Sequence, residues 1–114
     1  MSNKLYRGVR QGMIAQVYVD NEILSLEPSR VLHPSDATFE FGYFGSGPSQ
    51  TALAILFDAT EDKENSLKYM HEFKAEFIAT AEYHTGFTIL QSQVVQWLEK
   101  RVARDSNPGQ GWAI

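Results

Sequence analysis

Residues 39–60 read FEFGYFGSGPSQTALAILFDAT, an aromatic, alternating run that stops at a glycine-rich turn and resumes as an almost wholly apolar segment. The alternation over Phe39–Phe44 predicts a strand with one aromatic face, because successive strand side chains point to opposite sides. Pro48 suits the first position of a helix, where its missing N–H costs nothing, so Gly47 is expected as the N-cap. The apolar residues that follow predict a helix to about Thr60 that is buried on nearly all sides.

The chain before this stretch predicts a small sheet. Runs rich in valine, tyrosine and isoleucine at residues 5–10 and 14–20 are separated by a Gln11-Gly12 turn, and a short third strand is expected near residues 23–26. Residues 28–36 contain two prolines and two serines and are expected to form a loop.

The chain after the apolar segment predicts two more helices. Apolar residues recur at helical spacing over 67–78 and again over 94–102. Gly86 breaks the pattern between the two runs. Phe87 and Ile89 are expected to lead directly into the last helix.

The order of the elements, strands first and helices second, indicates an α+β domain. We expect an antiparallel sheet of about four strands followed by three helices packed on one face, the first of these helices being buried. A chain of 114 residues is long enough to bury such a core without disulfide bonds. One domain is expected over residues 1–104, and residues 105–114 are expected to be a tail that is either flexible or docked.

Composition narrows the classes of function. The chain has no cysteine, which excludes disulfides and thiolate metal sites. No apolar run approaches the roughly 20 residues of a membrane span, and the N-terminus has no apolar run that could serve as a secretion signal. We therefore expect a cytoplasmic protein without membrane contact. The formal net charge of -4 argues against nucleic-acid binding, which normally uses a basic face.

Two motifs resemble those of a small uncharacterised family of prokaryotic and phage-borne proteins. Tyr6-Arg7-Gly8 resembles the family's Tyr-x-Gly opening, and GYFGSGPSQ at residues 42–50 resembles its aromatic-Gly-Tyr-x-Gly-Ser-Gly-Pro core. His33-Pro34-Ser35 stands where members often carry a His-Ser-Pro element, and Phe41 stands in place of a frequent tryptophan. The resemblance spans residues 6–98. It implies occurrence in phages and mobile elements. Because the family is a domain of unknown function, the resemblance assigns no activity and no catalytic residue to this chain.

The glycine turn has two interpretations. Free N–H groups and the helix dipole gather at a helix start and can bind an anion, so a small ligand, a nucleotide or a hydrolase substrate is one alternative. The residues of such a site are His33, Tyr43, Ser46, Gly47 and Ser49. Pro48 removes one donor, and no Lys-Ser or Lys-Thr follows as in a Walker phosphate loop. We favour the other interpretation, in which the glycines permit a sharp corner and close packing. Gly45→Val is then expected to be severely destabilising if Gly45 needs a positive φ.

No catalytic constellation is recognisable. The G-x-S-x-G pattern of a hydrolase elbow is absent around Ser46 and Ser49. The only support for a catalytic triad of either serine with His33 and Asp36 is that the three residue types are present in the chain. The histidines show no metal-ligand spacing. We expect no metal, no cofactor and, in preference to a hydrolase, no enzymatic activity.

A protein-binding module is the function that we favour. Aromatic residues concentrate beside the glycine turn, and an exposed aromatic face marks an interaction surface, although aromatics also serve a core or a self-paired homodimer. Carboxylates near and on the second helix suit a basic partner surface. The contact residues expected are Phe39, Phe41, Phe44, Glu72 and Glu76. The partner is a host or defence protein if the gene is phage-borne.

Overall fold

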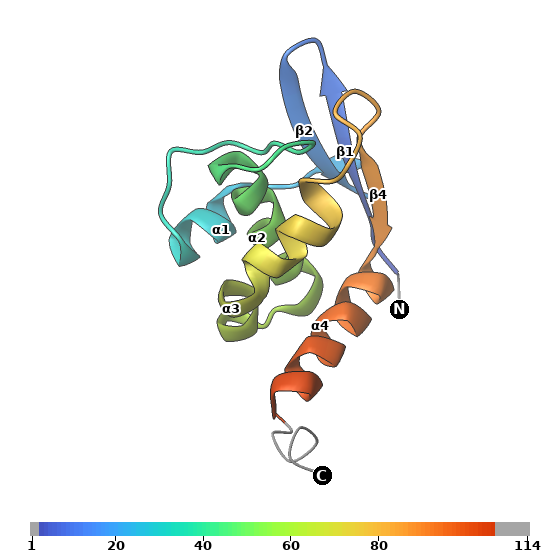
Figure 1. Cartoon of the computed structure of the whole chain (residues 1–114). Coiled ribbons are helices and arrows are strands. Elements are labelled where there is room, and N and C mark those ends of the chain that lie inside the picture. Colours follow the sequence, from blue (N-terminus) through green and yellow to red (C-terminus); the bar gives the residue numbers. More distant parts are fainter. Residues whose placement is uncertain (1–2, 107–114) are drawn as a thin grey trace.

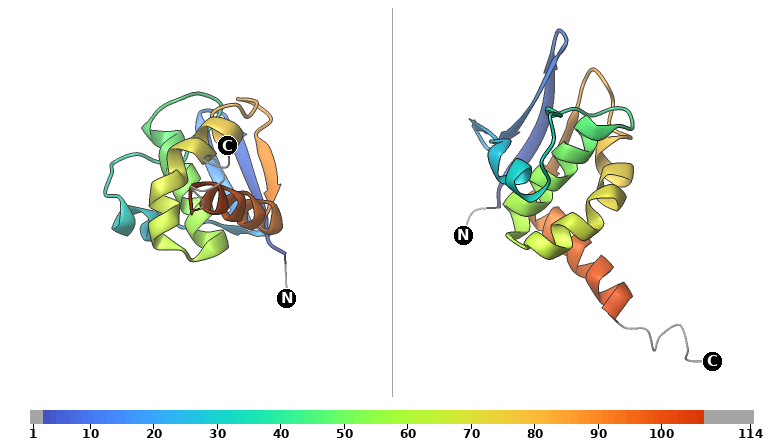
Figure 2. Two further views of the ribbon diagram at one scale, coloured as in Figure 1. Left: turned by 60° about the horizontal axis from the view of Figure 1, so that its bottom comes forward. Right: turned by 90° about the vertical axis from the view of Figure 1, so that its left-hand side faces the viewer.

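A four-stranded antiparallel sheet forms one layer of the fold, and the helices gather on one of its faces (Figures 1 and 2). The computed structural model describes residues 3–106. The strands are β1 (Leu5–Gln11), β2 (Ile14–Val19), β3 (Glu22–Ile23) and β4 (Phe87–Leu90), arranged in the order β3-β2-β1-β4. The α+β class expected from the sequence is confirmed.

The helices are α1 (Glu27–Leu32), α2 (Ser46–Thr60), α3 (Lys63–Phe73), which continues as the π-helical turn η1 (Lys74–Ile78), and α4 (Gln91–Ser106). The C-terminal end of α4 extends beyond the rest of the fold (Figures 1 and 2). Within the described part of the chain, the helices are too short and too polar to cross a membrane. The predicted tail falls almost wholly on residues 107–114, which lie outside the described residues.

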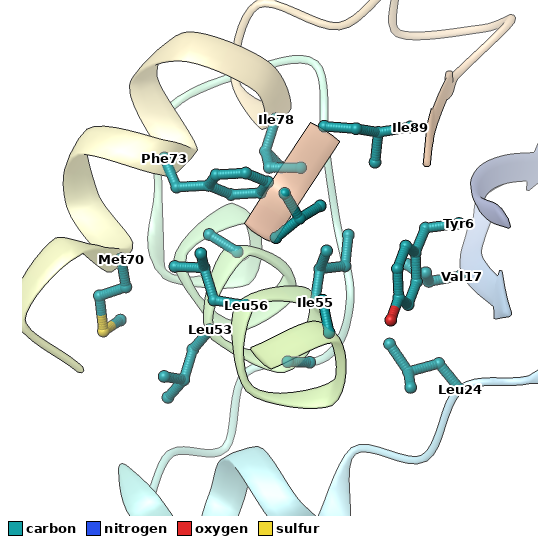
Figure 3. Packing of buried hydrophobic residues seen from close by; sticks show 14 of the residues in the cluster. Tyr6, Val17, Leu24, Leu53, Ile55, Leu56, Met70, Phe73, Ile78 and Ile89 are labelled. Atoms are coloured by element: carbon teal, nitrogen blue, oxygen red, sulfur yellow. The ribbon is translucent and has the colours of Figure 1, made fainter. Parts of the chain in front are cut away.

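The core lies between the sheet and the helices, with α2 at its centre (Figure 3). Every residue from Pro48 to Leu56 is buried, as the continuous apolar run predicts. Gln50 is one of three buried polar residues in this stretch, with Ser49 and Thr51, and its side-chain amide donates to the hydroxyl of Ser29 in α1 at 2.8 Å. The buried polar group is therefore satisfied, and α1 is tied to α2.

Residues 39–44, predicted as the fourth strand, form an irregular segment instead. The backbone of this segment bonds to helices. The hydroxyl of Thr51 in α2 accepts from the N–H of Glu40 at 2.9 Å and donates to the Glu40 carbonyl at 2.8 Å. The N–H of Gly42 donates to the carbonyl of Ile78 at 2.9 Å. Phe39 and Phe41 are buried whereas Tyr43 is exposed, so the alternation of aromatic residues marks neither a strand nor a single buried face.

The strand that completes the sheet is β4, in the region expected to lead directly into the last helix. It pairs antiparallel with β1, from Leu5 opposite Leu90 to Gly8 opposite Phe87. Gly86 precedes it at φ 79, and a Cβ there would lie 1.9 Å from the carbonyl oxygen of Gly8. Only glycine fits this close approach, so the glycine that breaks the helical pattern also brings the chain back to the sheet.

Two further boundaries differ from expectation. The predicted loop at residues 28–36 contains most of α1, because Pro28 falls in the first turn, where a helix tolerates proline. α2 begins two residues early, with Gly45 as N-cap and Pro48 at the third position, where no intrahelical N–H bond is lost. Gly45 is extended at φ 164. The left-handed φ on which the Gly45→Val expectation depends is therefore not present at Gly45, whereas Gly42 does adopt it, at φ 86.

Candidate functional site

The glycine corner is packed and hydrogen-bonded within the protein. The buried hydroxyl of Ser49 donates to the carbonyl of Gly45 at 3.0 Å and accepts from the Lys74 ammonium at 2.9 Å. Lys74 is the first residue of η1, so this pair of bonds joins the start of α2 to the π-helical turn. A Cβ on Gly47 would lie 2.7 Å from the Cβ of Glu40, which shows how closely the corner packs.

Of the other residues proposed for a ligand site, Ser46 and Tyr43 lie at this corner, where a Cβ on Gly45 would lie 3.3 Å from the Tyr43 ring, and His33 lies on α1. His33 is exposed at the C-terminal end of α1, where its backbone N–H donates to the carbonyl of Ser29. Tyr43 packs beside Tyr83, with ring centroids 6.5 Å apart, and its pKa is raised by burial and by the Glu40 carboxylate. Ser46 is exposed. Within residues 3–106, no group of three or more acidic or histidine side chains is placed to hold a metal.

The predicted protein-contact residues divide between core and surface. Phe39 and Phe41 are buried in the core, so their side chains do not form a surface patch. Phe44 is 65% exposed beside the corner. Glu72 and Glu76 are exposed but are engaged by arginines of α4. Of the five predicted contact residues, Phe44 is thus the exposed aromatic.

An ionic cluster joins α4 to α3 and η1. Arg101 bonds to Glu72 at 3.1 Å and to Glu76 at 3.3 Å, and Arg104 bonds to Glu72 at 3.2 Å. The indole N–H of Trp97 also donates to Glu76. These carboxylates hold α4 in place, and their charge is offset by the arginines.

The face of the sheet opposite the helices is uncovered, and we call it the open face. The burial pattern defines it, because Tyr6, Gly8, Val17 and Ile89 turn toward the core and their strand neighbours turn away. The residues of the open face are Leu5, Arg7, Val9, Gln11, Ile14, Gln16, Tyr18, Ile23, Thr88 and Leu90. Ile14 is 65% exposed and Ile23 is 59% exposed. The face is therefore largely apolar.

One row of side chains crosses the whole open face. The register places Thr88 opposite Arg7, Arg7 opposite Tyr18, and Tyr18 opposite Ile23, so the row includes all four strands. The guanidinium of Arg7 lies 5.3 Å from the centroid of the Tyr18 ring. Arg7 is the single charged residue of the open face, and it forms no ion pair within the described chain.

Arg10, on the same strand, turns to the opposite side and is fully engaged. Its side chain is 2% exposed and pairs with Glu40 at 2.8 Å. It also donates to the carbonyls of Tyr83, at 2.8 Å, and Phe41, at 3.1 Å, and it lies 3.7 Å from the centroid of the Tyr83 ring. Arg10 is thus structural, whereas Arg7 has its guanidinium hydrogen-bonding groups available.

The edge of β4 bears on the expected homodimer. The side-chain carbonyl of Gln93 accepts from the N–H of Leu90 at 2.8 Å. A second copy that paired along this edge would have to displace Gln93. Occupying the free backbone groups of an edge strand in this way hinders strand pairing between molecules.

The sequence model of one protein family matches residues 6–100. The chain belongs to DUF6166, a family of unknown function. No curated protein and no solved structure matches the chain. The DUF6166 region runs from β1 through most of α4 and so includes nearly all of the open face and the glycine corner. Membership in a family of unknown function agrees with the resemblance drawn from the sequence, while occurrence in phages stays a prediction.

The opening Tyr6-Arg7-Gly8 now has a physical explanation. The Tyr6 hydroxyl donates to Asp58 of α2 at 2.6 Å, and burial together with this carboxylate raises the pKa of Tyr6. A Cβ on Gly8 would lie 2.2 Å from the ring of Phe87. Tyr6 and Gly8 therefore serve the core, and Arg7 is left on the open face.

Proposed function

We propose that this DUF6166 protein is a non-catalytic protein-binding module and that its contact surface is the open face. The observation that supports the proposal is Arg7, the one charge of that face, which stacks on Tyr18 without an ionic partner in the described chain. Tyrosine and arginine are enriched among the residues that dominate binding energy at protein interfaces.

The surroundings of this pair suit an interface. Hot-spot residues work best at the centre of a patch whose neighbours exclude water. Here Ile23 and Thr88 flank the pair along the row, and Val9 and Gln16 form the next row. An exposed apolar face of this kind marks an interaction site on a soluble protein.

The charge of Arg7 indicates the chemistry of the partner. A guanidinium binds a carboxylate through two parallel hydrogen bonds, and burying it in an interface without such a partner would be costly. We therefore propose that the partner presents an apolar surface with an aspartate or glutamate opposite Arg7. A host or defence protein is the proposed source if the gene is phage-borne.

A catalytic or small-ligand site at the glycine corner has weaker support. The Ser49 hydroxyl already donates to the Gly45 carbonyl and accepts from Lys74. A nucleophile or a ligand donor at this position would first have to break these bonds.

The test compares full-length baits that differ at one charge. Arg7→Glu reverses the charge of the open face, and Lys100→Glu makes the same change of charge on the exposed surface of α4. A protein captured by the wild type is then purified and its affinity measured by calorimetry. We expect Lys100→Glu to bind as the wild type does and Arg7→Glu to bind at least about 30-fold more weakly, the loss that defines a hot spot. Thr88→Glu, on the same row, should also weaken binding.

Three results would contradict the proposal. The first is a purified partner that binds the wild type, Arg7→Glu and Thr88→Glu with equal affinity while all three unfold at the same urea concentration. The second is tight binding of single-stranded RNA that Arg7→Glu abolishes, which would make the open face a nucleic-acid surface. The third is a dimer of the wild type that Arg7→Glu dissociates, which would make the occupant a second copy.

A further inference from the structure

A groove on another part of the surface runs between α4 and the corner where α2 passes into α3. It has a volume of about 440 Å³, and we call it the α4 groove. Its lining residues are Ala59, Thr60, Asp62, Asn65, Val95, Leu98, Glu99, Val102, Ala103 and Ser106. The side of α4 that carries Trp97, Arg101 and Arg104 packs on α3 and η1, so the helix has a second side left for the groove.

The floor of the groove is apolar and follows the axis of α4. Leu98 is buried, and Val95 and Val102 are half-buried on the same side of the helix. The lining residues of α4 run from Val95 to Ser106. At a rise of 1.5 Å per residue this floor is about 16 Å long, or roughly three helical turns. A partner helix of similar length could lay three successive apolar side chains along it.

The rim of the groove is acidic. Asp62 and Glu99 are its charged lining residues. An adjoining hollow of about 760 Å³ shares Val95 and Glu99 with the groove and adds Asp58 and Glu61. Among the described residues that line these two hollows, the one cation is Lys4, and Asp58 already pairs with it at 3.3 Å.

These carboxylates differ from those on the other side of α4. Glu72 and Glu76 are offset by Arg101 and Arg104. Within residues 3–106, Glu61 and Glu99 form no ion pair, and the carboxylate of Asp62 accepts hydrogen bonds only from Asn65, as a helix N-cap does. An apolar floor between uncompensated carboxylates favours an occupant that is apolar on one side and cationic at its flanks.

We propose that the α4 groove binds an amphipathic helix of a partner protein, with apolar residues at spacings of three and four and with lysine or arginine on both flanks. Packing of a helix into a groove between helices is a common mode of recognition. A second copy of this chain fits less well, because the arginines of its α4 are engaged by Glu72 and Glu76. The proposal is independent of the open face, since the two surfaces have no residue in common.

The probe is a fluorescein-labelled peptide of about 14 residues with leucine along one helical face and lysine on the flanks, which is long enough to cover the groove floor. Fluorescence anisotropy measures its binding to the full-length protein. We expect saturable binding that weakens as salt rises, because the rim contributes exposed charge pairs. A peptide with the same leucines and glutamate in place of lysine should not bind.

Charge-matched variants separate the groove from the net charge. Glu99→Lys on the rim combined with Glu61→Lys in the adjoining hollow forms the rim pair of substitutions. The control pair, Glu22→Lys with Asp36→Lys, makes the same change of charge at exposed positions elsewhere. We expect about tenfold weaker binding for the rim pair and a change within about twofold for the control pair. Val102→Asp, which places a charge on the apolar floor, should abolish binding.

The proposal is overturned if the rim pair and the control pair weaken binding equally, because net charge alone would then explain the attraction. It is overturned if Val102→Asp folds and binds as the wild type does. It is also overturned if light scattering finds a dimer of the wild type that Val102→Asp dissociates, since the occupant would then be a second copy. None of these results bears on the open face, whose test uses Arg7 and Thr88.

Discussion

Arg7 and Arg10 lie three residues apart on β1, on opposite faces of the sheet, and this arrangement supports a sharp comparison of stability. Arg10→Met keeps most of the aliphatic side chain but removes the ion pair with Glu40 and the hydrogen bonds to two backbone carbonyls. Breaking a buried ion pair by removing one partner costs about 3–5 kcal/mol. Because Glu40 keeps 20% of its side-chain surface exposed, water can reach it and the lower end of that range applies.

We therefore expect Arg10→Met to lower the free energy of unfolding by about 3 kcal/mol, which corresponds to a fall in Tm of about 12 °C for a domain of this size. Arg10→Lys should recover less than half of this loss, because an ammonium cannot reproduce the planar, multiply bonded guanidinium. Urea denaturation followed by circular dichroism gives the free energy, and an unchanged slope with urea confirms that the unfolded state is comparable.

The matched control is Arg7→Met, which makes the same change on the same strand. We expect its free energy of unfolding to stay within about 0.5 kcal/mol of the wild type, because Arg7 contributes no ion pair to the described fold. The reasoning is refuted if Arg10→Met costs less than about 1 kcal/mol, or if the two variants lose similar stability. Either result would mean that the two arginines are not divided between structure and surface.

Three further outcomes are expected from the corner and its neighbours. Gly47→Ala should lower the free energy of unfolding by about 2 kcal/mol, because the new Cβ would lie 2.7 Å from the Cβ of Glu40. Gly45→Ala should lower it by less than about 1 kcal/mol, because the nearest neighbour of its Cβ is an exposed tyrosine ring at 3.3 Å. Urea denaturation of both variants measures the difference. Thr51→Val should cost about 1–3 kcal/mol in the same assay, since it leaves the N–H and carbonyl of Glu40 without their partner. The pKa of Glu82 is lowered by hydrogen bonds from the backbone N–H groups of residues 85 and 84. The stability that these bonds contribute is therefore fully present above the ordinary glutamate pKa and is lost as pH falls through the lower pKa of the folded state. An NMR titration that places the pKa of Glu82 at or above its ordinary value would contradict this.

Local patterns in the sequence predict much of the fold. The continuous apolar run over residues 52–57 predicts the buried central helix, because no other arrangement hides a helix that is apolar on all sides. The alternation over β1 and β2 predicts their hairpin, because a shift of one residue would expose the core side chains. These elements depend on short-range periodicity, which a sequence displays directly.

The elements that the sequence does not predict depend on distant partners. β4 has four residues, too few for a periodic pattern, and it exists because Gly86 allows it to reach β1 about 80 positions away in the chain. Residues 39–44 alternate as a strand would, yet their backbone partners are Thr51 and Ile78 on helices. Hydrogen-bond partners so far apart leave no local signature.

The candidate surfaces are hidden from the sequence for a related reason. Alternation along β1 groups Leu5, Arg7 and Val9 on one face and Tyr6, Gly8 and Arg10 on the other, and each set contains one arginine and apolar or small residues. Which face the helices cover is decided only by tertiary packing. The α4 groove likewise requires the position of α4 against the α2–α3 corner.

The measurement that tests the central claim most directly is amide hydrogen exchange of the full-length protein, free and bound to a purified partner. We expect slower exchange on binding along β1, β2 and β4, where Arg7, Tyr18 and Thr88 cross the sheet, and little change at residues 45–49. Protection concentrated at residues 45–49, with the strands unchanged, would contradict the account and return the function to the glycine corner.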